Sequence, residues 1–292
     1  MFKLSVITDE VSQDLKTVVS FAKEYGLDGV EVRTLWNKNI VQMSKAELRE
    51  LKATLDGEGL EIPSMATPFF KCGIDDEAKV KEHLDILRKS IDLGHELSCR
   101  LIRGFTFWRK GSYQKLRDEV LAQFQEVVRI LNPAPEFVLG IENEAATTVG
   151  TGNELAEFLS DLDSSQVRGI WDPGNVVFVE DIEETPYPDG YEAAKEYMIH
   201  FHLKDAKKDA EGKPHWTLVG EGDIDYEGQF AALARDGYTG FVSLETHWRP
   251  KELSKELVDR PGGGAYSEGG NVGSRLCMES TLRMLEKLGI RG

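Results

Sequence analysis

The chain has 292 residues, of which 40% are hydrophobic, and it carries a formal net charge of −16. This composition is typical of a soluble globular protein that is large enough for one α/β barrel or two ordinary domains. The acidic balance disfavours nucleic acid as a partner, because phosphate backbones attract basic surfaces. No apolar run reaches the roughly 18 residues of a membrane span, and the start of the chain turns acidic too early for a signal peptide. The cysteines at 72, 99 and 277 show no metal-knuckle spacing, which favours a reducing cytoplasmic location.

One pattern recurs along the chain, in which an amphipathic helix ends at glycine and an apolar strand follows almost at once. It predicts strands at 3–7, 29–33, 60–65, 100–105, 137–142, 166–171, 197–203 and 241–245. It predicts helices near 13–25, 44–56, 77–97, 112–131, 151–161, 190–196, 225–235 and 272–288. Ser44 and Glu47, three residues apart, are typical of a capping box at the start of the second helix.

Strict alternation of strands and helices implies parallel strands that are joined by crossover helices. Eight such units in this length predict an α/β protein with a closed (β/α)8 barrel, the TIM barrel. The alternative is an open doubly wound sheet, which usually carries a glycine-rich phosphate turn after its first strand. The first strand is followed by "VITDEVSQD", which contains no glycine. We therefore predict a single barrel domain over 1–292, with a glycine-rich loop at about 249–271 between the last strand and the last helix.

Polar residues gather at the ends of the last four predicted strands, where a parallel barrel has its active site. They are Glu142, Asn143 and Glu144, then Asp172 and Asn175, then His200, His202, Lys204 and Asp205, and finally Glu245 and His247. Carboxylates and imidazoles without a thiolate suit Mn²⁺, Mg²⁺ or Co²⁺ as well as Zn²⁺, and favour a catalytic over a structural metal site.

Each of these residues alone could be a solvated carboxylate, a turn residue or a core histidine. Their conjunction favours a site, because Glu142 ends the apolar run "FVLGI" and Glu245 ends "FVSL". A buried charge in such a place costs roughly several kcal/mol unless it is paired or metal-bound. Alternation along a strand puts His200 and His202 on one face, with His202 nearer the mouth. Glu142 and His202 are therefore the better ligands, and Glu144 and His200 are candidates for supporting or substrate-binding roles.

Further side chains are candidates for substrate contact. Trp108 follows the fourth predicted strand, and His215 lies in "KPHWTLVGEGDID" after the seventh; Asn175 and His247 lie at strand ends. His83 lies among acidic and basic residues of a predicted helix, so we expect it to be solvated.

Five segments occur in an order that resembles a known family. They are "IEN" at 141–143, "WDPGN" at 171–175, "HFHLKDA" at 200–206, "VGEGDIDY" at 219–226 and "GYTGFVSLET" at 237–246. They resemble the xylose isomerase-like TIM-barrel superfamily of sugar isomerases and epimerases, over nearly the whole chain. The resemblance implies a divalent metal held by residues matching Glu142, Asp172, His202 and Glu245. It also implies that Glu142 and Glu245 act as the acid/base pair, and that substrate contacts lie around Lys204, Asp205 and Lys208.

We expect from this a metal-dependent isomerase or epimerase of a sugar or sugar phosphate, with Mn²⁺ as the first choice of metal. Proton transfer next to a carbonyl would proceed through an enediolate that the metal stabilises.

The first alternative is a metal-dependent lyase or dehydratase that acts on a keto-sugar or keto-cyclitol at the same site. The second alternative is a DNA-repair phosphodiesterase with a trinuclear zinc cluster. The chain has only six histidines and a charge of −16, and both disfavour this hypothesis. The third alternative is a non-catalytic carbohydrate-binding subunit. The expected partner is a small sugar or keto-sugar, and the chain could form a homo-oligomer.

Overall fold

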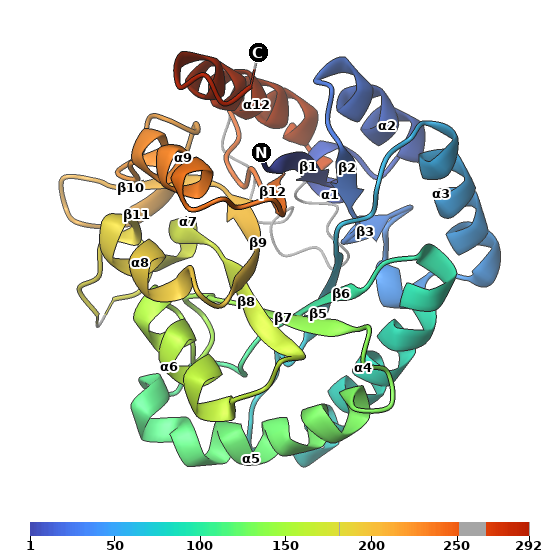
Figure 1. Cartoon of the computed structure of the whole chain (residues 1–292), viewed down its shortest axis with the longest axis vertical. Helices are drawn as coiled ribbons and strands as arrows, with labels where there is room; N and C mark the ends of the chain where they lie inside the picture. The colour runs from blue at the N-terminus through green and yellow to red at the C-terminus, as the bar shows by residue number, and fades with distance from the viewer. Residues whose placement is uncertain (181, 251–266, 292) are drawn as a thin grey trace. The chain divides into compact units, whose positions relative to one another are not determined.

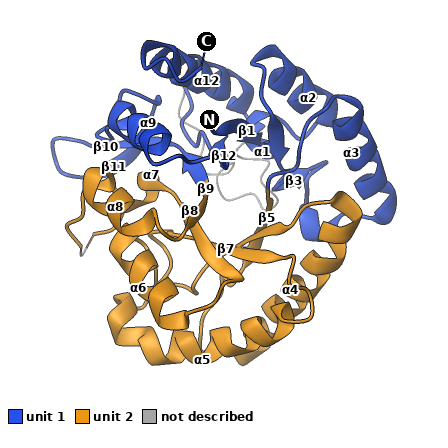
Figure 2. Cartoon of the chain, viewed as in Figure 1, with its two compact units in different colours: residues 1–63, 201–292 blue, residues 64–200 orange. Residues whose placement is uncertain are grey.

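The computed structural model describes residues 1–180, 182–250 and 267–291. The chain divides into two compact units, which Figure 2 shows in different colours. Unit 1 comprises Met1–Pro63 and Phe201–Gly292, and unit 2 comprises Ser64–His200. Strand β9 (Met198–Leu203) crosses this division, with residues 198–200 in unit 2 and residues 201–203 in unit 1.

Unit 1 contains parallel strands in the order β2-β1-β12-β9. The other strands of this set are β1 (Lys3–Ile7), β2 (Gly29–Glu31) and β12 (Phe241–Leu244). Its main helices are α2 (Leu15–Glu24), α3 (Lys45–Gly57), α9 (Tyr226–Arg235) and α12 (Gly270–Lys287), all seen in Figure 1. Shorter elements are α1 (Thr8–Val11), η1 (Ile40–Gln42), the hairpin of β3 (Thr34–Leu35) and β4 (Lys38–Asn39), and the hairpin of β10 (Asp205–Lys208) and β11 (Pro214–Thr217).

Unit 2 contains parallel strands in the order β8-β7-β6-β5. They are β5 (Met65–Phe69), β6 (Leu101–Gly104), β7 (Val138–Glu142) and β8 (Val167–Trp171). Its helices are α4 (Glu77–Leu97), α5 (Tyr113–Leu131), α6 (Gly152–Leu162), α7 (Pro173–Val176), η2 (Pro186–Gly190) and α8 (Tyr191–Ala194). Within this unit, α4, α5 and α6 lie outside the strands (Figure 1).

The helices begin and end where the local sequence predicts. The capping box of α3 is present, since the Ser44 hydroxyl accepts the Glu47 N–H and the Glu47 carboxylate accepts the Ser44 N–H. Helix α2 begins at the N-cap Asp14, whose carboxylate accepts the Thr17 N–H at 2.9 Å. The chain leaves α2 through Gly26 at φ +59, a left-handed conformation that glycine adopts without strain.

Most predicted strands match the observed ones to within a residue or two, but the third was placed too early. Residues 60–64 contribute only an isolated bridge between Gly29 and Glu61, and the strand proper is β5. Pro63 has no N–H, so it cannot donate a hydrogen bond to a neighbouring strand. The hairpin of β10 and β11 was not predicted.

Two predictions concern the chain outside these strands. Most of the glycine-rich loop predicted at about 249–271 lies outside the described residues. Across the residues that the structure describes, no helix combines the length and the apolar character of a membrane span.

Candidate active site

In unit 1, the ends of two neighbouring parallel strands bring His202 and Glu245 together. His202 lies opposite Ser243 in the register of β9 with β12, and Glu245 follows β12 directly. The Nδ1 atom of His202 lies 3.5 Å from a Glu245 carboxylate oxygen, Oε2. Its other ring nitrogen, Nε2, lies 3.3 Å from Oε1 of Glu31, which ends β2. All three side chains are buried, so each imidazole nitrogen faces a carboxylate in a water-poor environment.

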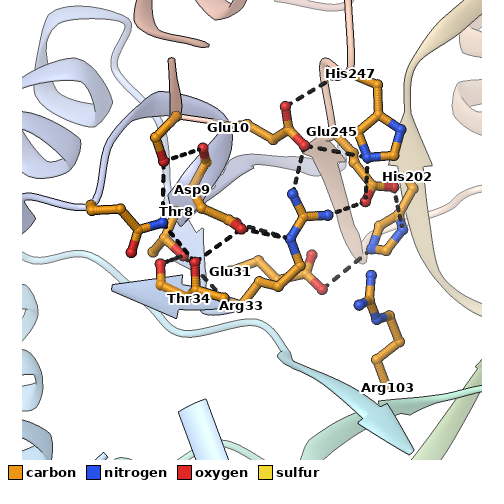
Figure 3. Close-up of polar contacts among 12 residues, drawn as sticks. Thr8, Asp9, Glu10, Glu31, Arg33, Thr34, Arg103, His202, Glu245 and His247 are labelled. Atoms are coloured by element: carbon orange, nitrogen blue, oxygen red, sulfur yellow. Dashed lines mark hydrogen bonds and ion pairs between the residues drawn. The ribbon is translucent and has the colours of Figure 1, made fainter. Parts of the chain in front are cut away.

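Both carboxylate oxygens of Glu245 also contact a cationic side chain. The Lys204 ammonium, which is buried, donates to Oε2 at 2.6 Å, and the Arg33 guanidinium donates to Oε1. Figure 3 shows that the same guanidinium also faces Asp9 and Glu10. Arg33 Nε lies 2.9 Å from Asp9 Oδ1, and Nη2 lies 2.6 Å from Glu10 Oε1. One buried arginine therefore ties three carboxylates together.

Burial raises the pKa of the Glu245 carboxyl, but Lys204, His247 and Arg33 outweigh it and hold that pKa well below its usual range. The pKa of Glu10 is likewise lowered to about 2, because His247, Arg249 and Arg33 outweigh the effect of burial. Both carboxyls are therefore ionised at neutral pH.

A second histidine, His247, lies beside Glu10 and Glu245. Its Nε2 lies 3.4 Å from an oxygen of Glu10 and 3.4 Å from an oxygen of Glu245 (Figure 3). The ring also packs edge-on against Trp216, with 5.1 Å between ring centroids. The Lys204 ammonium lies 5.2 Å from the same indole centroid, so Trp216 covers both groups.

In unit 2, Glu142 and Asp172 lie at the ends of the neighbouring strands β7 and β8, and both are buried. Asn175 links them, because its side chain donates to Glu142 Oε1 at 3.0 Å and its N–H donates to Asp172 Oδ1 at 3.1 Å. Asn143 closes the arrangement by accepting the Asp172 N–H at 2.8 Å. Arg103 on β6 lies 3.1 Å from Glu142 Oε2. The "WDPGN" segment therefore folds into a short turn that fixes both carboxylates.

A family model described as xylose isomerase-like TIM barrel matches residues 19–268. The chain belongs to the xylose isomerase-like TIM barrel family. An L-ribulose-5-phosphate 3-epimerase of Salmonella heidelberg is 23% identical in an alignment of 239 positions that covers 78% of this chain and 80% of the relative. An inosose dehydratase of Geobacillus kaustophilus is 22% identical in an alignment of 297 positions that covers 86% of this chain and 88% of the relative.

A solved structure of the IOLI protein with a bound zinc atom aligns with a TM-score of 0.72 and 16% identity. The alignment covers 98% of this chain and 99% of the other. The predicted (β/α)8 fold class is thereby confirmed, and so is the family resemblance. The prediction of one domain over 1–292 stays a prediction.

Asp205, a predicted substrate contact, uses its carboxylate within the chain. Oδ2 accepts the N–H groups of Gly220 and Gly222 at 2.8 and 3.0 Å, and Oδ1 accepts the N–H of Ala206 at 2.9 Å. A Cβ at Gly222 would lie 1.9 Å from Oδ1, so only glycine fits there. Burial raises the pKa of Asp205 to about 6 despite these bonds. The carboxylate shapes the loop at 219–224, and its contact with a substrate stays a prediction.

The other predicted substrate contacts lie in different surroundings. Glu144 pairs with Lys71 at 2.9 Å, and Trp108 is 41% exposed. Asn175 is buried against the two carboxylates described above. His215 on β11 is exposed, whereas the next residue, Trp216, is the one that faces Lys204. Their contact with a substrate stays a prediction.

Three polar groups near the ends of the first two strands were not predicted. Asp9 and Glu10 lie fully buried in α1, directly after β1, and Arg33 follows β2. The rule that found the other candidates, a polar residue at the end of an apolar strand, applies equally to "SVITDE" and "GVEVR".

The expectation that His83 is solvated was wrong. His83 on α4 is only 7% exposed, and its Nδ1 accepts the N–H of Phe70 at 2.8 Å. Phe70 has a left-handed backbone, with φ +59. The histidine therefore holds the loop after β5 in its shape, and it does so as the neutral tautomer with the proton on Nε2.

Because burial lowers the pKa of His83, the unfolded state takes up a proton on this residue more readily than the folded state does. The free energy of unfolding should therefore fall as the pH drops below the unfolded value of about 6.5. His83→Gln can still accept the Phe70 N–H but does not titrate, so it should show a smaller fall between pH 7.5 and 5.5 in urea unfolding. His95→Gln, at a half-exposed position of the same helix, is the control and should behave as wild type. Equal pH dependence in wild type and His83→Gln would contradict this role.

Proposed function

We propose that this chain is a divalent-metal-dependent epimerase or isomerase of a sugar or sugar phosphate. The observation that carries the proposal is that each unit pairs two of the predicted ligands at the ends of neighbouring parallel strands. His202 and Glu245 are paired in unit 1, and Glu142 and Asp172 in unit 2. Membership of a TIM-barrel family supports it, because active sites of this fold lie at the carboxyl ends of the strands. A sugar-phosphate epimerase among the relatives supports the substrate class.

In this proposal, Glu142, Asp172, His202 and Glu245 together hold the metal. Three carboxylates and an imidazole, all buried, are a donor set that suits Mn²⁺, our first choice, and also Mg²⁺, Co²⁺ and Zn²⁺. His202 would bind through Nδ1, because its Nε2 faces Glu31, and a carboxylate on the second nitrogen is the usual way to orient a histidine ligand. A bound divalent cation would act as a Lewis acid that stabilises negative charge on the enediolate oxygens.

In this proposal, Glu142 and Glu245 are the acid/base pair that transfers the protons. Glu245 is ionised at neutral pH, which is the form that accepts a proton. Lys204 now donates to Glu245 Oε2, the oxygen that lies nearest His202 Nδ1. A cation bound at that oxygen would compete with the Lys204 ammonium for its lone pairs, and an ammonium displaced in this way would be available to a substrate oxygen. Trp216 covers the ammonium and limits its access to water.

A second candidate reaction is the elimination of water from a keto-sugar or keto-cyclitol at the same site. The observation that favours it is the buried Lys204 ammonium beside Glu245, since elimination needs an acid for the departing hydroxyl as well as a base. An inosose dehydratase among the relatives is consistent with it. Product analysis separates the two reactions, because epimerisation conserves mass and elimination loses one water.

The experiment that tests the proposed function is metal analysis of the purified protein, followed by a solvent-deuterium exchange screen over free and phosphorylated ketoses and keto-cyclitols. Exchange that depends on the added metal would support the proposal. A protein that binds sugars but shows neither metal dependence nor exchange would instead be a non-catalytic carbohydrate-binding subunit. A cytoplasmic location and a homo-oligomeric state remain predictions.

The two histidines of β9 give a sharper test. His202→Ala should weaken Mn²⁺ or Zn²⁺ binding by more than about 100-fold in calorimetric titration, because it removes a ligand rather than a supporting group. His200→Ala removes a buried side chain that is not in the proposed ligand set, so it should change metal affinity by less than about 10-fold. Metal affinity that is unchanged in His202→Ala would remove this residue from the ligand set.

A further inference from the structure

Unit 2 contains a cavity of about 920 Å³ at the loop after β5 and the start of α4. Lys71, Asp75, Lys79, His83 and Trp108 are among the residues that line it. Its volume falls within the range of about 300–1,000 Å³ that small-molecule pockets occupy. None of the predicted ligands or acid/base residues lines it, so the proposed reaction leaves it unexplained.

Trp108 lines this cavity with an exposed aromatic side chain. Its indole is 41% exposed, but its backbone is held on both sides. The Trp108 N–H donates to Cys72 O at 2.8 Å, and a bridge joins Trp108 to Thr147. The preceding residue, Phe107, is left-handed at φ +66 and stacks on Phe70 with 4.1 Å between ring centroids. A large aromatic surface that is already ordered loses little entropy when a ligand stacks on it.

The charges around the cavity are balanced and paired. Lys71 lies 2.9 Å from Glu144, Lys79 lies 2.7 Å from Glu82, and Lys110 lies 2.6 Å from Asp75. A phosphate site would concentrate cationic donors on one anion, whereas here each ammonium already has a carboxylate partner. Mixed donors and acceptors beside an exposed indole are complementary to a neutral ligand with many hydroxyl groups and an apolar ring face.

The cavity also lies next to the chain that carries a proposed acid/base residue. Lys71 lines the cavity and pairs with Glu144, which is two residues beyond Glu142. The Lys71 ammonium also lies 4.3 Å from the Phe105 ring centroid, and Phe105 follows β6 directly. The wall of the cavity is therefore joined through Lys71 to the chain that follows Glu142.

We propose that this cavity is a second sugar-binding subsite, and that the substrate is a glycoside or disaccharide whose outer ring stacks on Trp108. This inference rests on the proposed function for the identity of the reacting ring. The subsite proposal adds to the proposed function that the substrate has more than one sugar ring.

The test measures binding, without turnover, by titrating the protein with glucose, cellobiose, maltose, sucrose and trehalose and following ligand NMR signals. At least one disaccharide should bind about 10-fold more tightly than glucose, since a second ring gains its own contacts. Trp108→Ala should remove this advantage to within about 2-fold, and Trp108→Phe should restore most of it. Leu276→Ala, at an exposed apolar position on α12, is the control and should bind like wild type.

Two results would overturn the subsite. One is a wild-type protein that binds every disaccharide no more tightly than glucose. The other is a Trp108→Ala variant, folded by circular dichroism, that keeps the full disaccharide advantage. Proton exchange on a single-ring ketose alongside either result would leave the proposed function standing while the subsite fails. Disaccharide binding without any metal-dependent exchange would support the subsite and count against the proposed function.

Discussion

Glu245→Gln should lower metal-dependent proton exchange by about 10²- to 10⁴-fold, the range that a positioned general base contributes. The substitution keeps the size of the side chain but replaces an ionised acceptor with a neutral amide. One of the two positions that accept from Arg33 and Lys204 becomes an NH₂ group, so a donor faces a donor in a buried environment. The metal should still bind, but more weakly, because an amide oxygen is a poorer ligand than a carboxylate.

The measurement is deuterium incorporation into substrate at saturating metal, with an unfolding curve for the same sample. Glu61→Gln is the matched control, since Glu61 belongs to the same unit and its side chain is half-exposed beside Lys3. It should exchange at the wild-type rate. Wild-type exchange in Glu245→Gln would exclude Glu245 from proton transfer and remove the mechanism proposed above.

Glu154→Ala should lower the free energy of unfolding by about 3–5 kcal/mol, the usual effect of breaking a buried ion pair from one side. Glu154 on α6 is buried, and its two oxygens receive the Arg109 guanidinium in a two-pronged contact with both distances 3.0 Å. The same carboxylate accepts the N–H groups of Gly150 and Tyr113 at 2.8 and 3.1 Å. Its removal therefore leaves the partly buried Arg109 guanidinium and two buried N–H groups without this acceptor.

Equilibrium unfolding in urea at pH 7 checks this value. Glu157→Ala is the matched control, because Glu157 lies on the same helix and, among the residues that the structure describes, its side-chain hydrogen bond is a long contact of 3.4 Å with Gln114. It should change stability by no more than about 0.5 kcal/mol. A loss in Glu154→Ala that is as small as in the control would show that the Arg109 contact adds nothing to stability.

The preference for His202 over His200 as a metal ligand needed only local reasoning. Alternation along β9 and the position of the strand end singled out His202 over His200. The same reasoning marked Glu142, Asp172 and Glu245, because a carboxylate that ends an apolar strand is unusual enough to be visible in the sequence. The structure pairs these residues within each unit, and their joint binding of a metal remains to be tested.

The partners of these side chains were outside the reach of the sequence. Arg33 meets Glu245 across 212 positions of the chain, and no local pattern indicates that contact. Asp205 is predicted to contact a substrate, and no local pattern indicated the three backbone N–H groups that its carboxylate accepts. His83 looked solvated because its neighbours are charged, yet it accepts a backbone N–H from a loop that it packs against.

The sequence by itself determined the α/β class, the ends of most strands and the candidate ligands, because hydrophobic periodicity and helix caps act over a few residues. The tertiary structure alone decided which charged side chains form ion pairs, which carboxylates accept hydrogen bonds from loop backbone, and where a cavity lies beside Trp108. The reason is physical: a side chain's period along its own strand or helix is a local property. Its hydrogen-bond partner, its burial and its pKa depend on residues that only folding brings within a few ångströms.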